Sequence, residues 1–530
     1  SGAYSDDGGG TAISLSLNNL TGKELHLNAE LFDVQNNAGK IAEKEVALKK
    51  GANDIAFLSK TKTNKVRLKQ TDNGMPLTDQ IVTLEKRNPV SLLGRLSYYM
   101  NEKEAVFNVN TNLADMDKMT AVLAVAGKTV EAPASAKFKI AMPLKDIPDG
   151  THVATLALMK DNQKVAETSS ELVKRPYKEG AAQINHFTRS LIHDGKPVFQ
   201  FAPFFVFSKH QSKEYVIGAV DWADKYGFRY LHILVDNRAV DQALLALGRA
   251  QEKGIKVMLW TKYYELTDEE CDALRKKLDF PNVISQMVLD EPELGMPSDA
   301  ALAYLRKMRA KFPYHPTHMN NTVLGIPNRY ANLETDILML DDYLTNNENR
   351  TVASVVDATD IMLKAGKEEG KPCLYFIVCG NFPLHHREPS YDEQVAQTYG
   401  NIAAGCTGLS YFYGLPTTPG NWKAYIQLNK EILSLNDILL SEEETTQAVS
   451  SGDPKTLRSI TRRHDGYVYV ISCNIDKNPI GKVTFTLPAE FKYDGDAEVM
   501  FEYRKIKPQD GRFSDEYPSH SRHVYKVKIK

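Results

Sequence analysis

The sequence contains no long hydrophobic run. Its longest apolar stretch, Val198–Phe207, spans ten residues and includes Gln200 and Pro203. A helix that crosses a bilayer needs about 20 consecutive apolar residues. No membrane-spanning helix is therefore expected in the 530 residues of the chain.

The sequence also lacks an excess of charge of one sign. Its 65 lysine and arginine residues nearly balance 67 aspartate and glutamate residues, which leaves a formal charge of −2. The two signs are mixed along the chain, without long basic or acidic blocks. A near-neutral chain has no general attraction to the phosphates of nucleic acid, so binding to DNA or RNA is not expected.

Cysteine is scarce, and the motifs that hold common cofactors are absent. The five cysteines show no C-x-x-C spacing, so no disulfide framework is predicted, and Cys373, Cys379 and Cys406 are expected to be buried free thiols. The chain has no G-x-G-x-x-G, no G-x-x-x-x-G-K-[ST] and no H-E-x-x-H motif. These absences argue against dinucleotide, phosphate-loop and zinc-protease sites. We expect no cofactor and no metal.

Four segments with different patterns are present. Residues 1–88 and 89–180 contain short alternating strands between turn residues, which predict an N-terminal β-sandwich and a second, immunoglobulin-like one. Residues 181–441 alternate apolar strands with amphipathic helices, and residues 442–530 return to a β pattern. The fold class is therefore multidomain, with a central α/β segment flanked by N-terminal β modules and a C-terminal β-sandwich.

The central segment predicts a (β/α)8 barrel. Eight strand-then-helix units fit within about 255 residues, close to the typical length of roughly 250 residues for this fold. The predicted strands are 198–207, 229–236, 256–260, 283–290, 316–321, 336–341, 372–378 and 408–413. The predicted helices are 213–226, 239–253, 268–278, 298–312, 351–369, 391–404 and 421–439.

Polar and aromatic side chains stand at the carboxyl ends of these predicted strands, where such barrels carry their active sites. Carboxylates and amides bind hydroxyl groups, and aromatic rings stack on the apolar faces of sugar rings. The combination predicts a carbohydrate ligand, an oligo- or polysaccharide. The candidate substrate-binding residues are Asp236, Trp260, Tyr263, Asp290, Asn320, Tyr343, Asn381 and Tyr413. His232, earlier on its strand, is expected to be a satisfied histidine of the barrel interior.

The end of strand four provides the candidate general acid. Asp290 and Glu291 emerge together, and repulsion between adjacent acids, with partial burial, raises a carboxyl pKa. Glu291 is the candidate catalytic acid on this basis. In the structural alternative, Asp290 and Glu293 cap the following turn and Glu291 pairs with a nearby base.

Strand six provides the second candidate catalytic residue, Asp341. Asp341 and Tyr343 share strand parity, whereas Asp342 is expected to point toward the helices. Two carboxylates can hydrolyse a glycosidic bond, and their separation distinguishes retention from inversion. Asp341 would activate water in an inverting reaction; alternatively, Glu388 would act as the partner after its loop moves.

Several motifs resemble clan A glycoside hydrolases. Leu191–Phe199 is similar to the entry to strand one of that clan, and Asp290-Glu291-Pro292 is similar to its Asn-Glu-Pro, whose Glu is the acid/base. Asp341-Asp342-Tyr343 and Gly405–Tyr413 resemble its strands six and eight. The resemblance covers roughly residues 184–530. It implies a multidomain glycosidase that is exported to the periplasm or cell surface of a bacterium, with the signal peptide absent from this sequence.

The sequence departs from the clan pattern at two positions. Asp290 replaces the usual Asn, and Leu374–Asn381 has no acid at the end of strand seven, where the clan carries its nucleophile. Two alternatives to a hydrolase therefore stay open. One is a glycan-binding protein without catalysis, and the other is a scaffold whose β modules bind cell-surface partners. The sugar, the linkage and the oligomeric state are left open by the sequence.

Overall fold

The computed structural model describes residues 11–19, 23–33, 40–49, 51–59, 63–71, 76–83, 89–236, 239–322, 334–346, 348–380, 387–412 and 415–530. The chain divides into two compact units. One consists mainly of residues 1–177 together with residues 291–307, and the other mainly of residues 178–530. None of the helices in the described ranges has the length and hydropathy that a membrane span requires.

The first unit begins with six antiparallel strands. They are β1 (Thr11–Asn19), β2 (Leu25–Asp33), β3 (Lys40–Leu48), β4 (Gly51–Ser59), β5 (Thr63–Gln70) and β6 (Pro76–Thr83). One sheet has the order β3-β2-β5-β6, and β1 pairs with β4. Alternate residues of β2, Leu27, Ala29 and Leu31, are buried, so this strand contributes one apolar face to a core.

A second group of strands in this unit forms two further antiparallel sheets. The strands are β7 (Val90–Gly94), β8 (Glu104–Thr111), β9 (Thr120–Val125), β10 (Lys128–Pro133), β11 (Lys137–Pro143), β12 (Gly150–Lys160) and β13 (Gln163–Lys174). The sheet orders are β10-β9-β12-β13 and β11-β8-β7. This two-sheet arrangement fits the all-β prediction for the N-terminal part of the chain.

The second unit contains the barrel. A small antiparallel sheet of β14 (Ala182–Asn185), β15 (Ser190–His193) and β16 (Lys196–Val198) precedes it. Eight parallel strands then pair in sequence order, and β24 closes on β17. The strands are β17 (Gln200–Phe207), β18 (Tyr230–Val235), β19 (Lys256–Thr261), β20 (Val283–Asp290), β21 (Thr317–Thr322), β22 (Ile337–Asp341), β23 (Cys373–Val378) and β24 (Gly408–Phe412). The predicted barrel is therefore confirmed.

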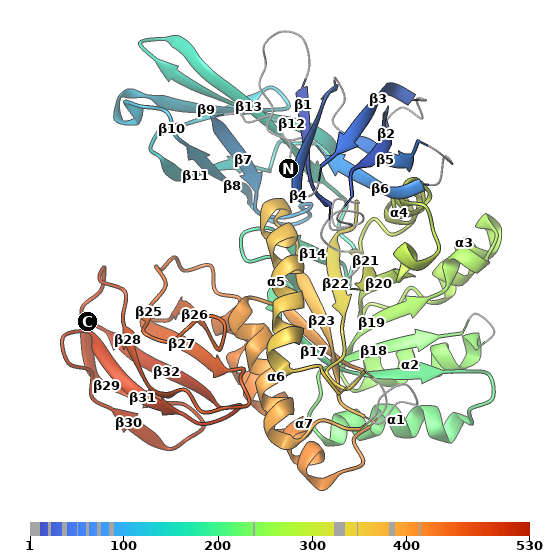
Figure 1. Ribbon diagram of the computed structural model, residues 1–530, viewed down its shortest axis with the longest axis vertical. Helices are drawn as coiled ribbons and strands as arrows, with labels where there is room; N and C mark the ends of the chain where they lie inside the picture. The colour runs from blue at the N-terminus through green and yellow to red at the C-terminus, as the bar shows by residue number, and fades with distance from the viewer. Residues whose placement is uncertain are drawn as a thin grey trace. The chain divides into compact units, whose positions relative to one another are not determined.

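Seven α-helices follow barrel strands in the described residues, one for each of the seven predicted helix ranges, and none is described between β21 and β22. They are α1 (Lys213–Lys225), α2 (Val240–Glu252), α3 (Asp268–Lys277), α4 (Ser298–Lys311), α5 (Val352–Glu369), α6 (Tyr391–Ala404) and α7 (Pro419–Leu439). Ser390 and Glu393 form the capping box that starts α6. In Figure 1, α5, α6 and α7 lie on the side of the barrel strands that faces the C-terminal strands.

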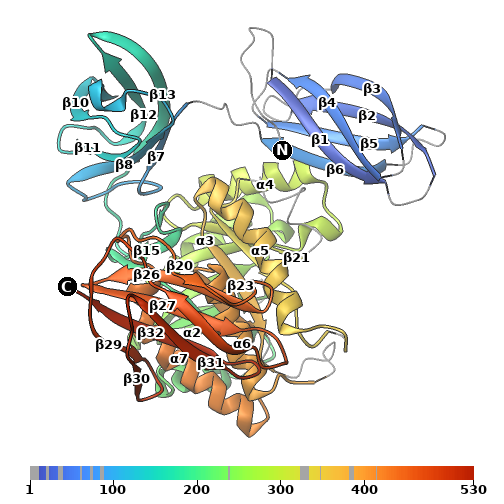
Figure 2. The same ribbon diagram turned by 60° about the vertical axis from the view of Figure 1, so that its left-hand side comes forward.

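The C-terminal strands form two antiparallel sheets beside these helices. They are β25 (Val449–Ser450), β26 (Leu457–His464), β27 (Tyr467–Asn474), β28 (Gly481–Thr486), β29 (Tyr493–Val499), β30 (Arg504–Ile506), β31 (Arg512–Tyr517) and β32 (Arg522–Ile529). The sheet orders are β25-β28-β31 and β26-β27-β32-β29-β30. Helix α6 packs against β26 and β27, and Figure 2 shows these strands in front of the barrel helices.

A buried ion pair joins the C-terminal sandwich to the barrel helices. Arg522 Nη2 of β32 lies 2.6 Å from Glu431 Oε1 of α7. The two side chains are only 10% and 5% exposed. Nearby, Gly400 lets the side chains of Ile475 and Val356 approach α6 closely. A Cβ added at Gly400 would lie 2.8 Å from Ile475 Cγ2 and 2.9 Å from Val356 Cγ2. The sandwich is thus docked on the barrel by contacts that tolerate little change.

Candidate functional site

Aromatic rings fill the barrel below its carboxyl end. The Phe204 ring of β17 lies 4.9 Å from the His232 ring, 5.7 Å from the Phe376 ring and 5.5 Å from the Phe412 ring. Tyr343, just after β22, stacks on Phe412 with 4.9 Å between ring centroids and 20° between ring planes. Aromatic rings therefore pack this part of the interior, and a ligand of the barrel is expected at the carboxyl ends of the strands.

Two histidines in this interior are structural. His232 Nδ1 lies 3.2 Å from Ser410 Oγ, and His318 Nε2 lies 3.5 Å from Ser285 Oγ. Burial lowers the pKa of both rings, that of His318 to about 3, so both are neutral at physiological pH. His232 thus lies in the barrel interior as expected, but its Nε2 has no hydrogen-bond partner among the described residues.

Three successive strands bring polar residues together at their carboxyl ends. Asp290 is the last residue of β20, Asn320 lies near the end of β21, and Asp341 is the last residue of β22. Asn320 Nδ2 donates a hydrogen bond to Asp290 Oδ1 at 3.0 Å. Asn320 is 1% exposed, and its Oδ1 has no hydrogen-bond partner in the part of the chain that the structure describes. A hydroxyl of a ligand could satisfy that acceptor.

The pKa of Tyr343 is influenced by both Asp290 and Asp341. Burial raises the pKa of Tyr343 well above its ordinary value, and the charges of Asp341 and Asp290 raise it further. The Tyr343 hydroxyl also hydrogen-bonds to the Asp341 carboxylate. The phenol therefore stays protonated and can hold Asp341 in one orientation. As expected from strand parity, Tyr343 accompanies Asp341.

Asp342 forms an ion pair with an arginine. Its carboxylate pairs with Arg350, which precedes α5, and its backbone carbonyl accepts a hydrogen bond from the Tyr375 hydroxyl. The carboxylate is 11% exposed. Asp342 therefore has a structural ion pair, as its expected outward orientation implies.

Glu291 has an unusual backbone conformation. Its φ of 41° and ψ of 48° place it in the left-handed region, directly before Pro292, which begins a short 3-10 helix (η3, Pro292–Leu294). A non-glycine residue in this conformation costs about 1 kcal/mol or more. Such strain at a strand end is common at functional sites, and here it falls on the residue predicted to be the general acid.

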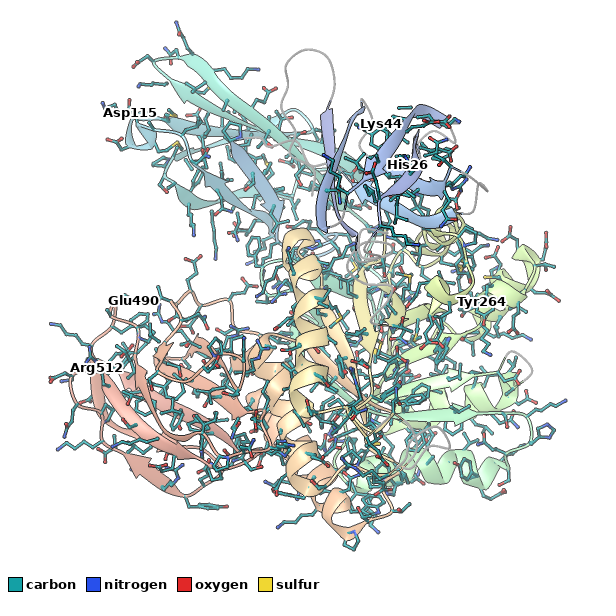
Figure 3. The ribbon with its side chains drawn as sticks, viewed as in Figure 1. His26, Lys44, Asp115, Tyr264, Glu490 and Arg512 are labelled. Atoms are coloured by element: carbon teal, nitrogen blue, oxygen red, sulfur yellow. The ribbon has the colours of Figure 1, made fainter. Side chains whose placement is uncertain are left out.

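The two tyrosines after β19 have different surroundings. Tyr263 is 2% exposed, and its ring packs 5.3 Å from the Phe312 ring, which favours a packing role over sugar stacking. Tyr264, in the same 3-10 helix (η2, Tyr263–Glu265), is 45% exposed and is labelled in Figure 3. Partial burial raises the pKa of Tyr264, with contributions from the charges of Glu265 and Asp290. Of these two tyrosines, Tyr264 has the exposed ring, whereas the residue predicted from the sequence is Tyr263.

The other four predicted substrate-binding residues are Trp260, Asp236, Asn381 and Tyr413. Trp260 is 7% exposed, with its ring 6.0 Å from that of Phe204, so it belongs largely to the barrel interior. Asp236 follows β18 and is half-buried, and its carbonyl accepts a 2.7 Å hydrogen bond from the Ala239 amide. Asn381 and Tyr413 lie outside the described residues.

Glu388, the alternative partner for Glu291, is held elsewhere. Its Oε1 accepts hydrogen bonds from the Thr417 amide and hydroxyl at 2.7 and 2.9 Å. Its Oε2 accepts from the Thr418 amide and hydroxyl at 3.0 and 2.9 Å. Although burial opposes ionisation, these bonds lower the pKa of Glu388. The carboxylate therefore anchors its loop to the start of α7.

No group of three or more His, Cys, Asp or Glu side chains is arranged to hold a metal ion among the residues placed by the structure. All five cysteines are buried and unpaired with one another. Burial raises the pKa of the Cys379 thiol, the one closest to the end of β23, so it is protonated at neutral pH.

Comparisons with known proteins found likenesses to solved structures alone. No protein-family model matches the sequence, and no curated protein matches it. Many solved structures do match. A candidate alpha-galactosidase/melibiase from Bacteroides fragilis is 11% identical, with a TM-score of 0.47 and coverage of 82% of this chain and 98% of its own. An Anoxybacillus alpha-amylase is 10% identical, with a TM-score of 0.44 and coverage of 62% and 98%.

A family 39 glycoside hydrolase from Bacteroides cellulosilyticus is 11% identical, with a TM-score of 0.39 and coverage of 83% of this chain and 100% of its own. These likenesses concern the fold, and the barrel itself is established by the strand pairing in the second unit.

Proposed function

We propose that the chain is a glycoside hydrolase in which Glu291 is the general acid and Asp341 is the second catalytic carboxylate. The observation that carries the proposal is the convergence of Asp290, Asn320 and Asp341 at the carboxyl ends of three successive barrel strands. This is the face where enzymes with this fold carry their active sites. Glu291 is assigned to the same site because it directly follows Asp290 in the chain.

The proposed reaction uses each group in a defined role. The Glu291 carboxylic acid donates its proton to the glycosidic oxygen, so that the leaving group departs as an alcohol. The Asp341 carboxylate takes a proton from the water that attacks the anomeric carbon, while the Tyr343 hydroxyl holds it in place. Asp290 and Asn320 bind sugar hydroxyls, and the exposed ring of Tyr264 offers a face for stacking.

The test is a screen of the full chain against a glycan library, followed by variants. A hydrolysed glycan is expected, and Glu291→Gln should lower kcat/KM by about 10²–10⁴-fold, the usual contribution of a general acid. Asp341→Asn should cause a loss of similar size. Glu265→Gln is the matched control, because Glu265 is an exposed carboxylate that also follows a barrel strand, and it should stay within threefold of the wild type (about 0.7 kcal/mol). Full activity in Glu291→Gln would refute the assignment.

A second function, glycan binding without catalysis, is favoured by one observation. Strand β23 ends at Val378 without an acid, and Glu388 is held by Thr417 and Thr418. If this alternative holds, the chain binds a glycan in the screen but hydrolyses none. In that case Asp290→Ala and Tyr264→Ala should weaken binding, whereas Glu291→Gln should leave it unchanged.

A further inference from the structure

A cavity lies at the opposite end of the barrel strands from the proposed active site. Its volume is about 160 Å³. Leu278 and Asp279, which precede β20, and residues 312–315, which precede β21, contribute to its lining. Connections that precede parallel strands lie at their amino ends, whereas Asp290 and Asn320 lie at the carboxyl ends. The cavity is therefore separate from the proposed active site.

Gln286 supplies a buried acceptor to this cavity. Its neighbour Ser285 bonds to His318 in the barrel interior, so the alternation along β20 directs Gln286 outward, toward the helices. The side chain is 3% exposed and lines the cavity. Its Oε1 has no hydrogen-bond partner within the described ranges. Buried polar atoms nearly always have a partner, so a donor from a molecule in the cavity is expected.

Three cationic side chains also line the cavity. Lys178 forms an ion pair with Asp279 at 2.6 Å, and Lys311 forms one with Asp272 at 2.9 Å. Arg275 is less engaged, because its Nε lies 3.7 Å from Asp272 Oδ1 and has no hydrogen-bond partner among the residues that are described. Its guanidinium is therefore the donor that remains for an anionic ligand.

His315, a further polar residue of the lining, does not add charge. Burial, reinforced by the positive charge of Lys178, lowers the pKa of His315 to about 4. The ring is therefore neutral at physiological pH. Phe312 supplies an apolar wall, which is itself packed against Tyr263. The cavity thus combines the Arg275 guanidinium, the buried Gln286 acceptor and an apolar surface with an ion pair between Lys178 and Asp279.

The geometry points to a binding site for a small hydroxy acid. Its carboxylate accepts hydrogen bonds from Arg275, and its hydroxyl donates to Gln286 Oε1. A cavity of about 150 Å³ accommodates benzene, so the ligand has roughly six to eight non-hydrogen atoms, the size of lactate or glycerate. The inference does not depend on the proposed glycosidase activity.

Calorimetric titration of the full chain tests this site. Glycerate and lactate are expected to bind with a Kd on the order of 1 mM, as the usual affinity per atom of small ligands allows. Propionate lacks the hydroxyl and propane-1,2-diol lacks the carboxylate, so each should bind at least tenfold more weakly. Inorganic phosphate is included as a second anion.

Variants localise the binding. Arg275→Met and Gln286→Leu should each weaken lactate binding at least tenfold. Arg249→Met is the matched control, since Arg249 forms a surface ion pair with Asp221 away from the cavity, and it should bind as the wild type does. Thermal unfolding of each variant reports whether the fold is intact. No saturable binding by the wild type, equal binding by Arg275→Met, or tighter binding of phosphate than of glycerate would overturn the inference.

Discussion

Replacing Arg522 with methionine removes a buried cation between the barrel and the C-terminal sandwich. Arg522 contacts Glu431 at 2.6 Å and Glu502 at 3.4 Å, and its guanidinium lies over the rings of Tyr399 and Phe501. Removing one partner of a buried ion pair costs about 3–5 kcal/mol, because the other charge stays buried. Glu431 keeps its hydrogen bonds from Tyr399 and Gln427, both 2.7 Å, so we expect the lower end, about 3 kcal/mol.

Urea unfolding measures this loss. The three tryptophans, Trp222, Trp260 and Trp422, all lie in the barrel, so their fluorescence reports barrel unfolding, and circular dichroism reports the β-sheets as well. Arg512→Met, which removes an exposed arginine from the same sandwich, is the control and should change stability by less than about 0.5 kcal/mol.

A double variant separates charge from packing. Arg522→Met combined with Glu431→Leu should lose less stability than Arg522→Met alone, because no uncompensated charge is left. A single variant within 0.5 kcal/mol of the wild type (the range of an ordinary surface substitution), or a double variant less stable than the single one, would refute the reasoning.

Three further predictions follow from single positions. Gly400→Ala should destabilise the fold by about 1–3 kcal/mol, because the added Cβ would press on Ile475 and Val356. Gly248→Ala in α2 is the control and should be neutral or stabilising by about 0.5 kcal/mol, because no atom lies within 4 Å of the added Cβ. Equal urea midpoints for the two variants would contradict this prediction. Glu291→Gly should be about 1 kcal/mol more stable than Glu291→Ala, since glycine tolerates a φ of 41°, and both should be inactive; equal stability in thermal unfolding would argue against strain. Because the folded-state pKa of Glu388 is lowered, its carboxylate stabilises the fold above its ordinary pKa of about 4.3 and loses that contribution as pH falls through the lowered value. Glu388→Gln should therefore have a lower Tm than the wild type at pH 7 and a similar Tm near pH 3; a constant difference across this range would contradict the assignment.

The barrel could be predicted from sequence because its strands are buried on both sides. Apolar runs such as Val283–Leu289 differ sharply from the amphipathic helices between them, and the predicted strand limits agree with the structure to within one or two residues. The N-terminal strands were harder. Strand β3 reads Lys40-Ile-Ala-Glu-Lys-Glu-Val-Ala-Leu48, and its charged residues conceal the alternation, so the strand was not predicted.

The site could be predicted only where position along a strand decides the outcome. Asp290 and Asp341 end their strands and Asn320 lies near the end of β21, so their place at the carboxyl end of the barrel could be predicted. The choice between Tyr263 and Tyr264 depended on the Phe312 ring, which is distant in sequence, and adjacent aromatics give no signal of which one faces the core. Likewise, the bonds from Thr417 and Thr418 to Glu388 join segments that no local pattern relates.

The location of a bound glycan tests the central claim most directly. A crystal of Glu291→Gln soaked with a glycan from the screen should show a sugar ring at the carboxyl ends of β20, β21 and β22, with hydroxyls in hydrogen-bond distance of Asp290 and Asn320. The scissile oxygen should lie beside residue 291, and the anomeric carbon should lie on the side of Asp341. A glycan bound only on a β-sandwich, with nothing at these strand ends, would contradict it.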